Sequence, residues 1–248
     1  NLVPVDIETK LQNKYQPTSE DIKKNNLNGV LVASPANPTG SMLNKSSLRK
    51  LIECSKEHNV SFISDEIYHG LEYESKAVSA LEITDHCYVI NSFSKYFSMT
   101  GWRVGWMIVP EDHVRQVEKV SQNLFICPPH ASQITALAAL DAKEELDQNV
   151  NVYKKNREIL LEELPKAGFT TFSPPDGAFY IYVDISKFSN DSLSFCKKVL
   201  DEAGVAITPG LDFDQNRGSN TIRFSYARST EDIIEGAKRI KKFMSSYN

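Results

Sequence analysis

The sequence predicts an α/β fold, a mostly parallel sheet sandwiched by helices, followed by a small α+β domain. Residues 29–33 (Gly-Val-Leu-Val-Ala) are a short, unbroken apolar run typical of parallel sheets. A helical pattern and further apolar runs follow it, which favours a right-handed α/β arrangement. After Pro165 and Gly168 the pattern changes to α+β. We therefore place a first, larger domain at residues 1–150 and a small domain at residues 151–248.

The elements of the first domain each carry a local signal. Residues 18–21 (Thr-Ser-Glu-Asp) indicate a capped helix start, and residues 44–58 have apolar side chains at helical spacing. We predict strands at residues 2–5, 29–33, 60–63, 87–90 and 104–109, and helices at 44–58, 111–123, 131–140 and 150–164. In the small domain we predict strands at residues 178–183, 205–207 and 221–226, and helices at 192–203 and 231–244.

Composition limits the classes of function. An apolar fraction of 41% in 248 residues is enough for a sizeable core, and a net charge of −4 without a long basic run gives a nucleic-acid or anionic-membrane partner no electrostatic support. The four cysteines include no CxxC pair, and the five histidines form no ligand-spaced cluster. No membrane-length apolar stretch or secretory signal pattern is visible. We expect a cytoplasmic protein with reduced thiols and no metal site.

One lysine stands out by its surroundings. Lys95 follows the predicted strand 87–90, and the aromatic residues near it in sequence are Phe93, Tyr96, Phe97 and Trp102. A lone lysine is usually solvated, but this aromatic density and the Ser92-x-x-Lys95 spacing favour a desolvated amine. Such an amine is a nucleophile that can form a Schiff base with an aldehyde. Arg103, flanked by glycines, offers a planar fork that suits a phosphate.

Three polar residues follow three predicted strands. Asn37, Asp65 and Lys95 each come shortly after an apolar run. In α/β sheets ligands bind beyond the carboxyl ends of the strands, so we expect these side chains to converge on one crevice. Taken alone, Asp65 is also compatible with an ordinary exposed strand end, and Asn37-Pro38 with a simple turn.

The motifs around these residues resemble those of a known family. Residues 92–95 (Ser-Phe-Ser-Lys) and 100–105 (Thr-Gly-Trp-Arg-Val-Gly) look like the lysine segment of the pyridoxal-phosphate (PLP) aminotransferases of class I/II, with the aspartate aminotransferase type of fold, fold type I. Residues 37–40 (Asn-Pro-Thr-Gly) and the pair Asp65 and Tyr68 extend the resemblance. It implies that residues 1–150 are part of the PLP-binding large domain.

The resemblance also implies roles for the candidate residues. Lys95 would hold PLP through a Schiff base and, once released by the substrate, act as the general base. Asp65 would face the pyridine nitrogen, while Asn37 and Tyr68 would bond the oxygen on the ring. The Asn37–Pro38 peptide bond is expected to be cis, against a base rate of about 5–6% for such bonds.

Ser92 and Arg103 would bind the cofactor phosphate, whereas we interpret Ser94 as structural. In the small domain, residues 223–227 (Arg-Phe-Ser-Tyr-Ala) resemble the family's carboxylate-binding strand, so Arg223, with Asn37, would bind the substrate's α-carboxylate. Without that resemblance, Arg223 is equally compatible with a structural ion pair. Asp214 follows Phe213 where glycine is frequent, so the conformation of this loop is left open.

The function implied is an aminotransferase that moves an amino group between an α-amino acid and a 2-oxo acid. Another fold type I PLP enzyme (a C–S lyase, synthase or decarboxylase) and a non-catalytic, aminotransferase-like ligand-binding module remain alternatives. The complete protein would be a homodimer. The family's N-terminal phosphate loop and its ring-stacking aromatic residue match no position here. We therefore expect this chain alone to bind PLP weakly and to expose apolar surface that favours self-association.

Overall fold

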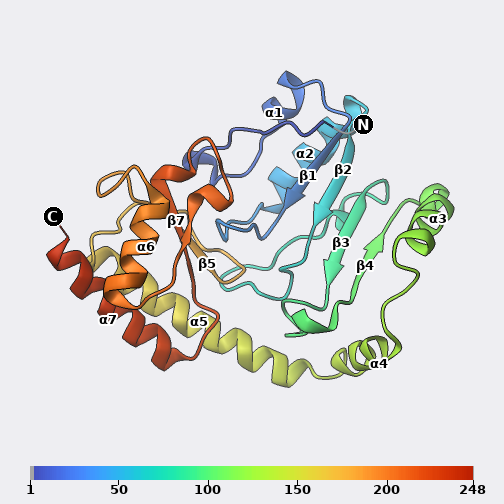
Figure 1. Cartoon of the computed structure of the whole chain (residues 1–248). Helices are drawn as coiled ribbons and strands as arrows, with labels where there is room; N and C mark the ends of the chain where they lie inside the picture. The colour runs from blue at the N-terminus through green and yellow to red at the C-terminus, as the bar shows by residue number, and fades with distance from the viewer. Residues whose placement is uncertain (1–2, 248) are drawn as a thin grey trace. The chain divides into compact units, whose positions relative to one another are not determined.

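The computed structural model describes residues 3–247 and divides the chain into two compact units (Figure 1). The first unit runs to Pro35 and continues from Met42 to Asp147; the second comprises Ala36–Ser41 and the chain from Gln148 onward. The short segment 36–41 is thus assigned to the second unit, whereas the sequence placed it in the first domain.

Close backbone packing explains this assignment. Gly177 donates its N–H to the carbonyl oxygen of Gly40 at 2.8 Å. Gly40 has a φ of +68°, and a Cβ on it would lie 2.9 Å from the carbonyl oxygen of Tyr180. Only glycine combines that conformation with so close a backbone approach.

The first unit is built on a four-stranded mixed sheet of order β1-β2-β3-β4. The strands are β1 (Gly29–Ala33), β2 (Ser61–Asp65), β3 (Tyr88–Ser92) and β4 (Gly105–Ile108). β1, β2 and β3 are parallel, and β4 runs antiparallel to β3. The predicted α/β class with a mostly parallel sheet is confirmed, and β4 makes the sheet mixed.

Helices α1 (Ser19–Lys24) and α2 (Lys45–Glu57) contribute to the core of this unit. The side chain of Asn44 caps α2 by accepting the N–H of Ser47, and Leu48, Leu51 and Ile52 of that helix are buried. The core of buried residues is Ile22, Val30, Val32, Leu43, Leu48, Leu51, Ile52, Cys54, Val60, Phe62, Ala80, Cys87 and Val89. On β1, burial alternates and Leu31 is 61% exposed, so in the described residues only one face of that strand is fully covered.

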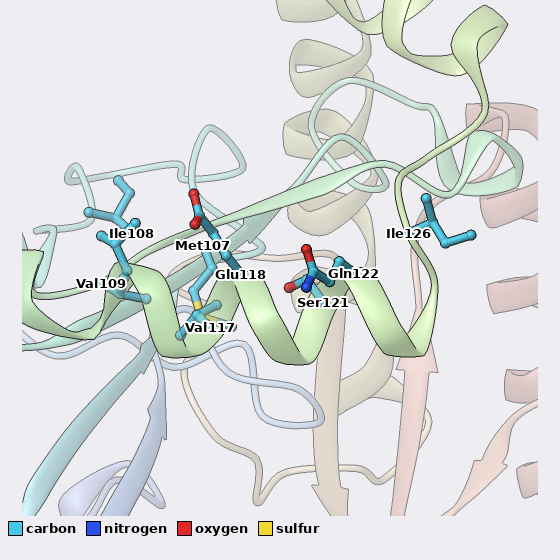
Figure 2. A pocket seen from close by; sticks show the side chains of 9 residues that line it. Met107, Ile108, Val109, Val117, Glu118, Ser121, Gln122 and Ile126 are labelled. Carbon is cyan, nitrogen blue, oxygen red and sulfur yellow. The ribbon is translucent and has the colours of Figure 1, made fainter.

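The remainder of the first unit is helical. It contains α3 (Val114–Leu124), α4 (His130–Ala139) and the start of α5 (Lys143–Lys166), with short 3-10 turns at Leu11–Asn13, Ala80–Glu82, Thr100–Trp102 and Glu111–His113. No residue of α3 is buried, and all four residues of β4 are exposed. An open groove of about 750 Å³ lies here, lined by Met107, Ile108, Val109, Val114, Val117, Glu118, Ser121, Gln122 and Ile126 (Figure 2).

The second unit is α+β, with an antiparallel sheet of order β5-β7-β6. Its elements are the rest of α5, β5 (Tyr180–Asp184), α6 (Ser192–Ala203), β6 (Thr208–Pro209), β7 (Thr221–Ser225) and α7 (Thr230–Ser246), with 3-10 turns at Gly210–Asp212 and Gly218–Asn220. Fully buried Phe169, Ile181, Phe195, Ile222 and Tyr226 form much of its core.

Three expected elements differ in position. Residues 205–207 are not a strand, because β6 begins three residues later than expected and pairs with β7 through Thr208 and Pro209. Residues 3–5 form no strand, and residue 2 lies outside the described part. Helix α5 begins at Lys143 instead of 150, with Glu144 and Glu145 in its first turn, where the helix dipole favours acidic residues. Across residues 3–247, no helix has the length and apolar character needed to cross a membrane.

Candidate active site

The carboxyl edge of the first unit's sheet carries several of the predicted residues. Asp65 is the last residue of β2, and Ser92 is the last residue of β3. Asp65 lies opposite Ala33 of β1 on one side and Ile90 of β3 on the other. Because β4 is antiparallel and its Gly105 pairs with Ser92, Arg103 enters the sheet at this same edge. The topology therefore brings Asp65, Ser92 and Arg103 to one edge of the sheet.

Lys95 lies in a tight loop that follows β3, residues 93–99, which we call the lysine loop. The Thr100 hydroxyl donates to the Ser94 carbonyl oxygen at 2.6 Å, and the N–H of Ser98 donates to the Lys95 carbonyl oxygen at 3.0 Å. The Lys95 side chain is half-buried, and its Nζ lies 5.7 Å from the centroid of the Tyr68 ring. Tyr68, three residues after Asp65, is buried with 4% exposure. The amine is thus directed to the turn that follows β2.

Aromatic side chains form the base of the lysine loop. The Phe93 ring packs against Phe97 and Trp106, with centroids 4.7 and 5.1 Å apart. Phe93 and Phe97 pack against a small core of Met99, Val104 and Ala136 of α4. Trp102 is 43% exposed and is not part of this packing, in contrast to the enclosed aromatic setting that the sequence suggested.

Asp65 is half-buried and accepts the N–H of Ile67 at 3.1 Å. Burial raises its pKa, with a smaller contribution from the neighbouring Glu66 charge, while the Ile67 N–H and His69 act in the opposite direction. A half-buried carboxylate is stabilised in its charged form by a cationic partner, such as a protonated ring nitrogen.

A second carboxyl group, Glu66, was not identified from the sequence. It is 3% exposed, and its Oε1 accepts the Ser64 hydroxyl at 3.0 Å, the Ser79 hydroxyl at 3.1 Å and the Ala80 N–H at 2.8 Å. Its Oε2 lies 3.5 Å from Nδ1 of His69. This network fixes the turn between Asp65 and Tyr68. Nothing in the local sequence distinguishes Glu66 from an exposed acid, because the Ser79 and Ala80 donors come from a distant segment.

The two predicted phosphate ligands differ: the Ser92 hydroxyl already has hydrogen-bond contacts, whereas the Arg103 side chain is exposed. The Ser92 hydroxyl lies 2.9 Å from Ser94 Oγ and 3.1 Å from the Val104 carbonyl oxygen, and it accepts the Ser94 N–H at 3.0 Å. Ser94 is 8% exposed, which is consistent with its structural interpretation. Arg103 is exposed, has a φ of +56°, and donates from Nη1 to the Thr100 carbonyl oxygen at 2.9 Å. Its guanidinium remains accessible to an anion.

The other candidates, Asn37 and Arg223, belong to the second unit. Arg223 donates from Nη1 to Asn37 Oδ1 at 2.6 Å and from Nη2 to Thr208 Oγ1 at 3.3 Å. Its guanidinium carbon lies 4.2 Å from the Tyr180 ring centroid and 4.7 Å from that of Phe213. The Asn37–Pro38 bond is cis, which confirms the expectation, and Ser34–Pro35 is cis as well.

This setting leaves Arg223 available to a carboxylate. Within residues 3–247, no Asp or Glu forms a salt bridge with Arg223, whose side-chain partners are Asn37 and Thr208. This argues against the structural ion pair considered above. Its Nε is buried and has no hydrogen-bond partner among the described residues. A guanidinium fixed between two rings, with donor capacity left over, is preorganised for bidentate binding.

The loop after Phe213 has a defined conformation. Oδ1 of Asp214 accepts the N–H groups of Asn216 and Arg217 at 2.9 and 3.0 Å, and Oδ2 accepts Arg217 Nε at 3.0 Å. Burial of Asp214 opposes ionisation, but these donors outweigh it and lower the pKa. Aspartate therefore organises this turn, at a position where glycine is frequent in the family.

Comparisons with known proteins agree with this geometry. The profile of the family described as aminotransferase class I and II matches residues 2–240. A valine–pyruvate aminotransferase of Mycobacterium tuberculosis is 43% identical over an alignment of 248 positions that covers 98% of this chain and 64% of that protein. An aspartate aminotransferase of Sulfurisphaera tokodaii is 36% identical, covering 87% of this chain and 56% of the relative.

Solved structures give the same result. A Silicibacter pomeroyi protein superposes with a TM-score of 0.97 at 61% identity, covering 98% of this chain and 66% of that one. An aminotransferase from Mycobacterium tuberculosis superposes with a TM-score of 0.91 at 43% identity, covering 95% of this chain and 62% of the other. The chain thus spans less than two thirds of the length of these relatives. With a profile match along nearly its whole length, it belongs to the class I and II aminotransferase family.

Proposed function

We propose that this chain is part of a PLP-dependent aminotransferase that moves an amino group between an α-amino acid and a 2-oxo acid. The observation that carries the proposal is the position of Lys95: its amine lies 5.7 Å from the Tyr68 ring centroid, in the loop that follows β3. Asp65 and Ser92 end the neighbouring strands at that edge, and Arg103 enters the sheet there.

The residues in the first unit fit PLP by their chemistry. Lys95 would hold the aldehyde carbon, Asp65 would pair with the pyridine nitrogen, and Tyr68 would bond the ring oxygen. Arg103 and Ser92 would bind the phosphate, with Arg103 supplying the charge. When bound, the cofactor supplies an electron sink for the bonds of the substrate's α-carbon. Asn37 would add a donor to the ring oxygen.

The chain's own residues would then bind substrate and move its proton. Arg223 would pair with the α-carboxylate through its planar fork, and Asn37 would orient the same group. The released amine of Lys95 would take the proton from the substrate's α-carbon and return it to the acceptor carbon. Glu66 and His69 would keep the Asp65–Tyr68 turn in place.

Covalent capture and turnover test the proposal together. The protein is mixed with PLP, reduced with borohydride and digested, and we expect the added mass on the peptide that contains Lys95. With valine and pyruvate, substrates suggested by the name of one relative, alanine formation by the complete protein should require Lys95. Lys95→Ala should lose both signals, while Lys119→Ala, an exposed lysine on α3, should retain them. Capture spread evenly over surface lysines would contradict the proposal.

Arg223→Ala in the complete protein gives a separate prediction. Removing one partner of a charged, hydrogen-bonded pair costs on the order of 2–5 kcal/mol, so the KM for the amino acid should rise steeply while capture of PLP by Lys95 is retained. Steady-state kinetics and the borohydride assay measure these two effects. Arg228→Ala is the matched control, because Arg228 is exposed and pairs with Asp232 at 3.0 Å. If Arg228→Ala raised KM instead, the carboxylate role would belong to that residue.

The remaining features of the complete protein are also proposals. Family membership supports a homodimer, in which a second subunit can complete the site. A cytoplasmic location is supported by cysteines that are all free in the structure: Cys54, Cys87, Cys127 and Cys196.

A further inference from the structure

Tyr96 follows Lys95 directly, and none of the roles proposed above uses it. It is half-buried, and its hydroxyl donates to Oδ1 of Asp147 at 2.7 Å. Asp147 lies in the first turns of α5 and also pairs with Lys143 of the same helix. One hydrogen bond therefore connects the lysine loop to a helix 51 positions further along the chain.

The Tyr96 ring lies directly against Gly70. A Cβ on Gly70 would come within 2.6 Å of two ring carbons of Tyr96, and Gly70 has a φ of +93°. The N–H of Gly70 donates to Oε1 of Glu72 at 2.8 Å, which holds this turn. The same turn begins at Tyr68, whose ring lies beneath the Lys95 amine. Lys95 and Tyr96, which are consecutive in the lysine loop, thus contact Tyr68 and Gly70 of the same turn.

The hydrogen bond keeps its direction over the working pH range. Burial, the hydrogen bond to Asp147 and the charges of Asp147 and Glu72 raise the pKa of Tyr96 to about 12. The Lys143 ammonium and the Tyr96 hydroxyl lower the pKa of Asp147, with Lys76 adding to the effect. Tyr96 therefore remains a neutral donor and Asp147 a charged acceptor, the stronger kind of hydrogen bond.

Asp147 also occupies a special place in the chain. It is the last residue of the first unit, and α5 continues into the second unit from Gln148. Tyr96 therefore ties the lysine loop to the helix that joins the two units.

We propose that Tyr96 is a positioning residue for Lys95: seated on Gly70 and bonded to Asp147, it holds the lysine loop so that the amine stays over Tyr68. The inference rests on the proposed function of Lys95 as the group that holds PLP. Tyr96 acts through the backbone of its neighbour and touches no reacting atom.

Two reactions of the Lys95 amine test the proposal. In Tyr96→Phe the ring remains but the bond to Asp147 is lost, so the loop should release the amine to solvent. We expect capture of PLP at Lys95, measured by borohydride reduction and peptide mass, to slow roughly tenfold, since a hydrogen bond to a charged group is lost. Acetylation of Lys95 in the protein without PLP, measured relative to the exposed Lys119 of α3, should become faster. General destabilisation would also expose the amine and slow capture, so it is separated by the matched control, which loses a phenol hydrogen bond elsewhere.

Tyr88→Phe is the matched control, because it removes a phenol hydrogen bond of 2.6 Å, to His113, at the other end of β3. It should leave both rates unchanged. Asp147→Asn keeps an acceptor and should stay near the parent chain, whereas Asp147→Ala should reproduce Tyr96→Phe. If Tyr96→Phe does not fold, the comparison of Asp147→Asn with Asp147→Ala still tests the positioning role.

The outcomes separate the two proposals. If the complete parent protein shows no capture at Lys95, the proposed function itself fails. If the parent is captured at Lys95 but Tyr96→Phe and Asp147→Ala behave like Tyr88→Phe, the function stands and the positioning role is wrong.

Discussion

At the scale of single residues, Asp65 carries the clearest conflict between folding and function. Its pKa is raised above the ordinary value of 3.8, chiefly by burial. A carboxyl group with a raised folded-state pKa contributes stability that is present below its unfolded pKa and is lost as pH rises through the folded one. Near neutral pH the protein without cofactor therefore keeps a charge that burial disfavours. Such a cost is typical of a residue retained for binding.

Asp65→Asn should accordingly stabilise the cofactor-free protein near neutral pH. Asparagine can still accept the Ile67 N–H, but it carries no charge to desolvate. The advantage over the parent chain should grow as pH rises from about 4 through the raised pKa and then level off. Urea unfolding at several pH values measures it, with Asp112→Asn on the exposed turn before α3 as control. Equal effects of the two substitutions would contradict the prediction.

At the scale of elements, the loop 36–41 determines where Asn37 can act. Although it follows β1 in the chain, it packs with the second unit through Gly40 and Gly177. There Asn37 Oδ1 meets the guanidinium of Arg223. The loop therefore places an amide beside the proposed carboxylate ligand, and Gly40 is what lets the backbone approach so closely.

Gly40→Ala should destabilise this arrangement. Alanine is disfavoured at a φ of +68°, and its Cβ would press on the carbonyl oxygens of Tyr180 and Gly177 at 2.9 and 3.0 Å. We expect a loss of more than about 1 kcal/mol in the free energy of unfolding. Gly236→Ala, in α7 with nothing within 4 Å of the new Cβ, should instead gain about 0.5–1 kcal/mol. Urea titrations followed by circular dichroism compare the two variants. If Gly40→Ala left the free energy of unfolding unchanged, the predicted steric clash would be wrong.

At the scale of the whole molecule, the chain leaves an apolar surface uncovered. β4 is an edge strand whose four residues are all exposed, and α3 buries none of its residues. Between them lies the groove of Figure 2, where Ile126 is 78% exposed. An open strand edge beside apolar side chains favours association with another chain. The relatives are longer than this chain, which covers 64% of the first of them.

We expect this chain alone to self-associate, with Ile126 contributing strongly. Ile126→Lys places a charge on the groove and should lower the average mass seen in sedimentation velocity at a given concentration. Leu193→Lys is the matched control, since Leu193 is 60% exposed on α6 of the second unit. Association that responds equally to both substitutions would show that this surface has no special part in it.

The sequence by itself determined most of the local features. The apolar run 29–33 is β1 and the pattern at 192–203 is α6. Asp65 ends β2 and Lys95 follows β3, so both lie at the carboxyl side of the first unit's sheet, whereas Asn37, which was expected beside them, belongs to the second unit. These features depend on short-range periodicity and on turn chemistry, which a single segment contains in full.

Only the tertiary structure decided the partners of those residues. Arg223 and Asn37 are 186 positions apart, and Tyr96 and Asp147 are 51 apart, so no local pattern records either hydrogen bond. The burial of Glu66 likewise depends on donors from a separate turn at Ser79 and Ala80. Side-chain pairing follows from how distant segments pack, and packing is a property of the whole unit, which the order of residues along one segment does not contain.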